Sequence, residues 1–252
     1  MRTAIHALGG VPGPVSAAEF IETLGLWDEP GKGSRPRLIA VMVGSADGRA
    51  SVDGRAGGLS SPADRSVMRE LRTVCDALIV GPTTFITERY EHLLDPGQPE
   101  RRIERGRAPE PLLVTISRSL DPALERVPLL GREGARVRVF TESERDLGPT
   151  AAEVEVRRFA PGALTPAQCL EELVSDGVRL AVTEGGPTLL HALIADGLVD
   201  DLVLTIAPLV VGGDGPTVLT GPVFEPPTEL ELRSVLRGED HIFLHYALRS
   251  AR

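Results

Sequence analysis

Short runs of apolar residues alternate along this chain with stretches in which apolar residues recur at helical spacing. A continuous run such as 38–43 (LIAVMV) is typical of a strand that is buried on both faces of a sheet. Helices are predicted where a capping residue and a proline precede the periodic stretch, as at Ser61-Pro62 and Thr165-Pro166. The pattern predicts strands at 38–43, 77–81, 112–116, 137–140, 154–156, 178–182, 202–206, 230–236 and 242–248, and helices at 61–75, 165–177 and 187–198.

Strands that alternate with helices predict an α/β protein whose central sheet is mostly parallel and flanked by helices. The last two strands follow each other without a helix, so we expect them to form an antiparallel C-terminal edge. Residues 9–36 are rich in glycine and proline around one helical pattern at 16–26. We therefore assign residues 1–36 to an N-terminal arm and 37–252 to a single domain. Residues 92–111 are polar and rich in arginine, which predicts a loop.

Composition and charge narrow the range of functions. The 252 residues are 42% apolar and 25% charged, as in an ordinary globular protein with a substantial core. A net charge of −9 argues against a nucleic-acid partner and against an anionic membrane surface. No apolar stretch is long enough to span a membrane, and Cys75 and Cys169 are expected to be reduced, so we predict a cytoplasmic protein.

The most informative turn is Gly185-Gly186-Pro187, which joins an apolar strand to a helix. A helix N-terminus of this kind can bind a phosphate through its free backbone amides and its dipole. For this motif alone, a tight turn without a ligand is an equally weighted alternative. Three further glycine-rich strand ends, at 44–48, 81–84 and 212–213, would meet it at the carboxyl edge of a parallel sheet. Together the four turns favour a nucleotide-binding cleft.

Acidic residues near this edge are the candidates for chemistry. Glu184 ends a buried strand, where a carboxylate needs a partner or a ligand. Asp47 precedes a glycine, which is typical of a structural turn, and Asp64 lies in the first turn of a helix, where a carboxylate complements the dipole. His241 and His245 share a strand but would lie about 13 Å apart. No metal site is therefore predicted.

In order along the chain, these motifs resemble the reductase domain of the bifunctional deaminase/reductase family of riboflavin biosynthesis. The resemblance covers about residues 37–248. Within the family, the chain is most similar to a free-standing actinobacterial branch. That family has a dihydrofolate-reductase-like α/β fold and uses NADPH. The residues that carry the resemblance are 45–48 (SADG), 51–54 (SVDG), Ser61 and Pro62 with Asp64 and Arg65, Arg72, 76–81 (DALIVG), 183–190 (TEGGPTLL), 198–201 (LVDD) and 206–212 (IAPLVVG).

The resemblance implies roles for individual residues. Asp64 and Glu184 are expected to be catalytic, Asp64 as the acid that protonates or orients the acceptor, with water as the alternative proton source. Asp47, Arg72 and Glu184 are expected to bind the substrate. Arg118 follows a strand, where an arginine suits the 2′-phosphate of NADP. The implied cofactor-binding residues are Gly81, Thr83, Thr84, Ser117, Arg118, Gly185, Gly186, Pro187, Thr188, Leu189 and Gly212.

The implied reaction is a hydride transfer from NADPH to a carbon–nitrogen double bond. It would reduce 5-amino-6-(5-phosphoribosylamino)uracil to its ribitylamino product. Two alternatives stay open: a reductase of dihydrofolate or another pterin, and a catalytically silent NADP-binding module. The family also implies a homodimer, with 202–211 and the last two strands at the interface.

The chain departs from the family in two places. The residues of the zinc deaminase domain are not present, since the sequence has no Pro-Cys-x-x-Cys motif. In the family, an acidic, proline-containing motif follows the threonine that matches Thr84. Residues 85–90 (FITERY) replace that motif here. The second departure affects which substrate the family resemblance implies. The residues expected to bind the cofactor match those of the family.

Overall fold

The computed structural model of the protein describes residues 5–7, 14–27 and 33–249. Its strands are β1 (Ile5–Ala7), β2 (Pro14–Val15), β3 (Arg37–Ser45), β4 (Ala77–Val80), β5 (Leu112–Ile116), β6 (Arg136–Thr141), β7 (Glu153–Arg158), β8 (Leu180–Thr183), β9 (Asp201–Ala207), β10 (Leu230–Gly238) and β11 (His241–Leu248). Its helices are α1 (Ala17–Thr23), α2 (Pro62–Val74), α3 (Pro82–Thr87), α4 (Gln98–Glu104), α5 (Pro166–Ser175) and α6 (Pro187–Ala195), with short 3₁₀ helices η1 (Ala56–Gly58), η2 (Pro122–Arg126) and η3 (Pro128–Gly131).

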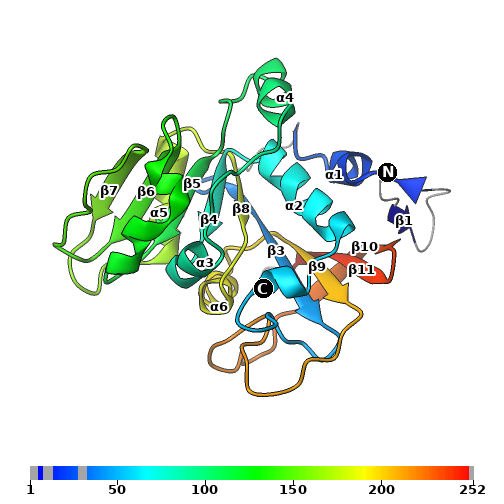
Figure 1. The fold of residues 1–252 in the computed structure, drawn as a ribbon. Helices are drawn as coiled ribbons and strands as arrows, with labels where there is room; N and C mark the ends of the chain where they lie inside the picture. Colours follow the sequence, from blue (N-terminus) through cyan, green and yellow to red (C-terminus); the bar gives the residue numbers. More distant parts are fainter. Residues whose placement is uncertain (1–4, 8–13, 28–32, 250–252) are drawn as a thin grey trace.

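In the described part of the chain, eleven strands form one sheet in the order β2-β1-β10-β11-β9-β3-β8-β4-β5-β6-β7 (Figure 1). The strands from β9 to β7 in this order run parallel to one another. Strand β11 pairs antiparallel with β9, and β10, β1 and β2 continue the antiparallel edge. The predicted mostly parallel sheet with an antiparallel C-terminal edge is therefore confirmed.

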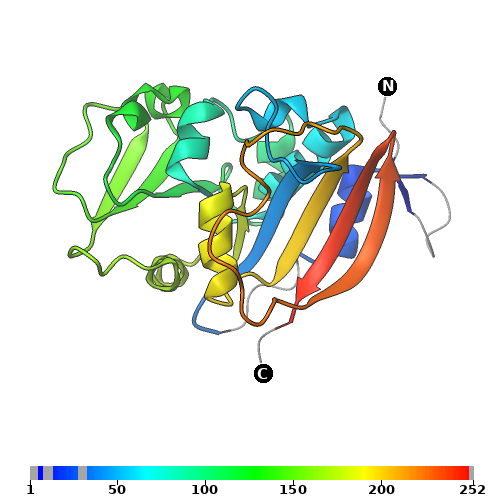
Figure 2. The ribbon, with the colours of Figure 1, turned by 90° about the horizontal axis from the view of Figure 1, so that it is seen from below.

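Helices cover both faces of the parallel part of the sheet (Figures 1 and 2). Helices α1 and α2 pack on one face, where Phe20, Leu71 and Leu78 belong to one buried cluster. Helices α5 and α6 pack on the other face, where Leu173 and Leu193 belong to a second cluster. Complete burial of one such side chain contributes roughly 1.5–3 kcal/mol. The parallel strands, with their carboxyl ends, thus lie between a layer formed by α1 and α2 and a layer formed by α5 and α6.

Helix α2 follows from its sequence. The Ser61 hydroxyl accepts a hydrogen bond from the Asp64 amide at 3.1 Å, and Pro62 occupies the first helical position. Both features fix the start of the helix where the sequence predicts it. The buried apolar face consists of Ala63, Val67, Leu71 and Val74.

Residues 92–111 contain helix α4, so the loop prediction is wrong there. Its buried side chains are those of Gln98 and Arg102, one turn apart. The Arg102 guanidinium donates to the carbonyls of Thr73 and Cys75 at 2.8 and 2.6 Å. These carbonyls lie at the end of α2, where helical partners are missing. The pattern does not predict the helix because its buried face is polar. Helix α3, also not predicted, is too short to show a period.

The described parts of the N-terminal arm pack against the rest of the protein. Strands β1 and β2 extend the sheet beyond β10. Phe20 and Ile21 of α1 are buried in the cluster that they share with α2. The boundary after residue 36 stays a prediction. Among the described residues, no helix combines the length and the apolar character that crossing a membrane requires.

Candidate active site

A cleft of about 500 Å³ lies beside α2, where β3 and β8 approach their carboxyl ends. Ligands of open α/β sheets collect at this edge. Met42 of β3 lines one side, and Ser60, Arg65, Arg69 and Arg72 line another. Residues 88–95, which we call the outer wall, also line the cleft. Glu184, the residue after β8, lies at the same cleft.

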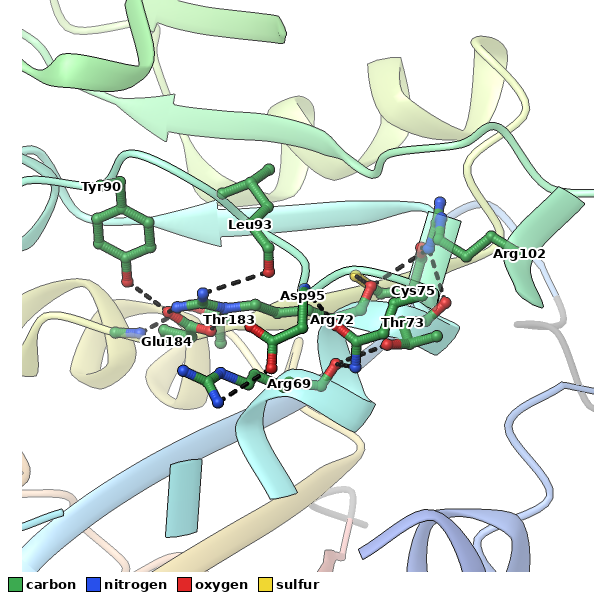
Figure 3. A network of polar contacts seen from close by, with 12 residues as sticks. Arg69, Arg72, Thr73, Cys75, Tyr90, Leu93, Asp95, Arg102, Thr183 and Glu184 are labelled. Carbon is green, nitrogen blue, oxygen red and sulfur yellow. Dashed lines mark hydrogen bonds and ion pairs between the residues drawn. The ribbon is translucent and has the colours of Figure 1, made fainter. Parts of the chain in front are cut away.

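Glu184 and Arg72 form a buried bidentate ion pair, as the close-up in Figure 3 shows. Nε and Nη2 of Arg72 donate to the two carboxylate oxygens at 2.5 and 2.8 Å. The two side chains are only 6% and 12% exposed, respectively. Burial opposes the charge of Arg72, but the Glu184 carboxylate outweighs it and raises the pKa of Arg72 above its ordinary value. Arg72 therefore stays charged.

Tyr90 completes this network from the outer wall. Its hydroxyl donates to the Glu184 carboxylate, and its ring centroid lies 5.2 Å from Cζ of Arg72. Burial and the charge of Glu184 raise the pKa of Tyr90 well above its ordinary range, so the hydroxyl keeps its proton. Arg72 also donates to the Leu93 carbonyl at 3.4 Å, and Arg69 pairs with Asp95 at 3.0 Å (Figure 3). The network ties the outer wall to α2.

Asp64, the predicted proton donor, does not line the cleft and is 1% exposed. The hydroxyl of Ser60, which does line the cleft, donates to the Asp64 carboxylate. Burial raises the pKa of Asp64 above its ordinary value of 3.8. The hydroxyls of Ser60 and Thr205 and the charges of His241 and Arg65 oppose this increase only in part. Asp64 is thus a weaker acid than an exposed aspartate, and its link to the cleft is the hydrogen bond with Ser60.

Asp47, predicted to bind the substrate, lies outside the cleft lining. Its carboxylate accepts hydrogen bonds from the Ser45 hydroxyl at 2.5 Å and from the amides of Val211 and Gly212 at 3.0 and 2.7 Å. These donors lower the pKa of Asp47. The residue ties the turn after β3 to the loop after β9. The ligand-binding roles of Asp47 and Gly212 stay predictions, and these atoms already have partners within the protein.

The two glycine turns at the ends of β4 and β8 pack against each other. The Gly81 amide donates to the Gly185 carbonyl at 2.6 Å. A Cβ atom on Gly81 would lie 3.2 Å from the Gly186 nitrogen, and one on Gly186 would lie 2.9 Å from Oγ1 of Thr84. Gly185 has a φ of 79°, and the Gly185–Gly186 peptide bond is cis. Only glycine suits so close an approach of two backbones.

The turn leads into α6, whose first amides can bind a phosphate. The N–H groups of Thr188 and Leu189 lie in the first helical turn, where no partner exists within the helix. Strand β5 lies next to β4, so Ser117 and Arg118 follow in the same row of strand ends. Ser117 is buried, whereas Arg118 is exposed and can reach a ligand. A dinucleotide therefore fits this edge. The sheet brings together Gly81, Thr83, Thr84, Ser117, Arg118, Gly185, Gly186, Pro187, Thr188 and Leu189.

A helix start that can bind a phosphate, beside a cleft with a buried ion pair, suits an oxidoreductase that uses a nicotinamide cofactor. The chain belongs to the RibD C-terminal domain family, whose model matches residues 36–244. The family and the oxidoreductase class predicted from the sequence are thereby confirmed, and the dihydrofolate-reductase-like fold class agrees with the sheet.

Relatives and a solved structure agree with this assignment. The chain is 30% identical over 199 residues to the 2,5-diamino-6-ribosylamino-4(3H)-pyrimidinone 5′-phosphate reductase of Archaeoglobus fulgidus, which covers 75% of this chain and 89% of that protein. It is 30% identical over 220 residues to the reductase of the same name from Methanothermobacter thermautotrophicus, covering 82% and 96%. A pyrimidine reductase-like protein of Corynebacterium diphtheriae shares the fold, with 23% identity, a TM-score of 0.75, and coverage of 94% and 100%.

Arg72 is predicted from the sequence, but several other residues of the cleft are not. Arg65, Arg69 and Arg72 lie on one side of α2 at a spacing of four and three residues, which places them on the same helical face. This spacing could have predicted an anion-binding wall. Tyr90 and Ser60 carry no such signal, because their partners are set by the fold.

Proposed function

We propose that the protein is an NADPH-dependent reductase of a ribosylamino-pyrimidine 5′-phosphate in riboflavin biosynthesis. The observation that carries this proposal is that Glu184, at the cleft, directly precedes the glycine turn that opens α6. The site for the acceptor and the phosphate-binding edge are thus continuous. When bound, NADPH supplies the hydride, while the residues of the chain hold the two ligands in register.

Arginines on α2 support a phosphorylated substrate. Arg65 and Arg69 line the cleft, and Arg89 adds a third guanidinium from the outer wall. The Arg69–Asp95 pair is half-exposed, and such a pair contributes about 0–1 kcal/mol, so a phosphate can replace the carboxylate. Guanidinium groups bind phosphate through paired hydrogen bonds. We assign the substrate phosphate to the part of the cleft that these three arginines line. We assign the pyrimidine ring to the part beside the Arg72–Glu184 pair.

Oxidation of NADPH in the presence of the pyrimidine phosphate, followed at the nicotinamide absorbance, tests this function. The uracil form is predicted from the sequence, while the two archaeal relatives are named for the 2,5-diamino form. Both forms carry the reacting ribosylamino group, so both are assayed. We expect turnover that requires the 5′-phosphate. Turnover with dihydrofolate alone would instead identify a pterin reductase, and cofactor binding without any turnover would identify a silent module.

Replacement of Arg118 by alanine is expected to weaken NADPH binding by about 10- to 150-fold and to leave NADH binding nearly unchanged. A charge-assisted hydrogen bond contributes about 1.5–3 kcal/mol, and only NADPH carries the 2′-phosphate. Fluorescence titration with both cofactors measures the effect, and Arg126→Ala is a matched control at another exposed arginine. Equal losses for NADPH and NADH would remove Arg118 from the 2′-phosphate site.

We also propose a homodimer formed through the antiparallel edge. No described helix lies in front of β9, β11 and β10 in Figure 2. On β10, Leu230 and Leu232 are exposed, and they lie opposite Leu248 and Tyr246 of β11. The loop residue Val210 is 81% exposed. An apolar surface of this kind favours association.

Light scattering should give twice the 26.9 kDa mass of one chain. The variant Leu232→Glu, which places a charge on the exposed apolar surface, should be a monomer. A wild-type protein that is monomeric at micromolar concentration would refute the dimer.

Both cysteines support a reducing compartment. Cys75 and Cys169 are free and buried. Burial raises the pKa of each thiol to about 12, so neither is suited to act as a thiolate nucleophile. We therefore assign the protein to the cytoplasm.

A further inference from the structure

Ser60 connects Asp64 to the cleft, because it lines the cleft and its hydroxyl is bonded to the Asp64 carboxyl group. Asp64 is 1% exposed and is absent from the cleft lining, so its carboxyl group cannot touch a ligand there. Ser60 lines the cleft and is hydrogen-bonded to that carboxyl group. Any proton that moves between Asp64 and a molecule in the cleft therefore has a single-step route through Oγ of Ser60.

We propose that Ser60 is a catalytic residue that passes a proton from Asp64 to the substrate nitrogen. The proposal rests on the proposed function, in which reduction of a carbon–nitrogen double bond adds a hydride to carbon and a proton to nitrogen. As the new N–H bond forms, the O–H bond of Ser60 breaks. Along the same Ser60–Asp64 hydrogen bond, the neutral Asp64 carboxyl group then donates to Oγ: the O–H bond of Asp64 breaks, Ser60 regains a proton, and Asp64 is left as a carboxylate. The hydride comes from the reduced nicotinamide, so atoms and charge balance.

The backbone around Ser60 is held in place for this role. The Arg65 guanidinium donates to the Ser60 carbonyl at 2.9 Å. Nε2 of His241, on β11, lies 3.0 Å from the carbonyl of Leu59. These two contacts hold the backbone of residues 59 and 60, and the hydrogen bond to Asp64 orients the hydroxyl. A fixed donor is what general acid catalysis requires, because the acid must lie within hydrogen-bond reach of the reacting atom.

The groups that face Asp64 allow it to store a proton. Thr205 of β9 contributes a hydroxyl, while His241 of β11 and Arg65 of α2 contribute charge. Nδ1 of His241 is buried and has no hydrogen-bond partner among the described residues. Burial outweighs these groups and favours the neutral carboxyl group. Asp64 is therefore suited to donate through Ser60 rather than to bind a ligand as an anion.

Replacement of Ser60 by alanine should lower kcat by about 10²-fold or more while NADPH affinity stays within about twofold, because the hydroxyl serves only proton transfer. Ser60→Thr keeps a hydroxyl and should restore most of kcat. Ser66→Ala, on α2 with its hydroxyl bonded to the Pro62 carbonyl, is the matched control and should leave kcat unchanged. Steady-state and single-turnover kinetics measure these effects.

The double variant Ser60→Ala/Asp64→Asn separates a relay from two independent roles. A relay predicts that the double variant is no slower than the slower single variant, whereas independent roles predict that the two losses multiply. Carbon-13 NMR of the Asp64 carboxyl group gives a readout without turnover: loss of the Ser60 hydrogen bond should raise its titration midpoint. Wild-type kcat in Ser60→Ala, multiplying losses, or an unchanged midpoint would overturn the relay alone. A wild-type protein that oxidises no NADPH with either pyrimidine phosphate would overturn the proposed function and the relay with it.

Discussion

Replacement of Glu184 by alanine is expected to lower the free energy of unfolding by about 3–5 kcal/mol. The substitution leaves the Arg72 guanidinium buried without its counter-ion, and it removes the acceptor of the Tyr90 hydroxyl. Urea denaturation, with the midpoint and slope fitted for each variant, measures the loss. The cost arises from the charge left behind, so it should exceed that of a typical surface substitution several-fold.

Two further variants test this explanation. Replacing both partners by apolar residues, in Arg72→Met/Glu184→Leu, should restore much of the stability, because no buried charge is left uncompensated. Glu184→Gln keeps the shape of the side chain, and as a change in a substrate-holding group it should chiefly raise KM. A loss below about 1 kcal/mol in Glu184→Ala would show that water reaches Arg72 and that the pair is not truly buried.

Replacement of Asp64 by asparagine is expected to lower kcat by about 10²–10⁴-fold with little change in cofactor affinity. Asparagine keeps the shape and the hydrogen-bonding capacity of the side chain but has no proton to donate. Steady-state kinetics and cofactor titration measure the two quantities. If Asp64 served only as a helix-start carboxylate, the variant would lose about 0.5–2 kcal/mol of stability and would keep near-normal turnover.

The raised pKa of Asp64 gives this prediction a pH dependence. As an acid, Asp64 is active while protonated, so kcat should fall as pH rises through its pKa, and the asparagine variant should lack that decline. Stability follows the same sign: above 3.8 the unfolded chain releases the proton while the folded protein keeps it, so stability should fall until the pH passes the folded pKa. Urea unfolding of the wild type and of Asp64→Asn at a series of pH values tests this. If the free energies of unfolding of the two proteins changed with pH in parallel, the prediction would be contradicted.

Asp47 provides a matched control of opposite sign. Its pKa is lowered by the Ser45 hydroxyl and two backbone amides, so its contribution to stability is present above 3.8 and is lost as pH falls through the folded pKa. Asp47→Asn should therefore flatten the acid limb of the stability profile and leave the limb assigned to Asp64 in place.

Features that depend on local chemistry could be predicted from the sequence. The Ser61 cap and Pro62 fix the start of α2, and the paired glycines fix the turn before α6. The continuous apolar runs predict strands that are buried on both faces, and the sheet has them in its parallel part. In each case the residues that determine the element are neighbours in the chain, so a single sequence contains the necessary information.

Features that depend on contacts between distant segments could not be predicted in this way. Tyr90 and Glu184 are 94 residues apart, and nothing near Tyr90 in the chain indicates its partner. Asp47 takes donors from Val211 and Gly212, which a second loop supplies. Asp64 could be recognised as an acid near the cleft, but its burial behind the cleft lining brings it under the influence of Thr205 of β9 and His241 of β11, which are distant in the chain.

The outer wall is attached to the protein at both ends, and this affects how the enzyme can diversify. Tyr90 is bonded to Glu184 at one end, and beyond the other end Arg102 is bonded to the carbonyls that finish α2. Residues 91–95 line the cleft between these attachments. Leu93 and Leu94 belong to the buried core, but Glu91 and His92 are exposed and Asp95 is half-buried. Substitutions at these three positions can alter which acceptors enter the cleft without loosening the core. Among descendants of such an enzyme, changes of substrate range are therefore expected to accumulate there, while Tyr90 and Arg102 are retained.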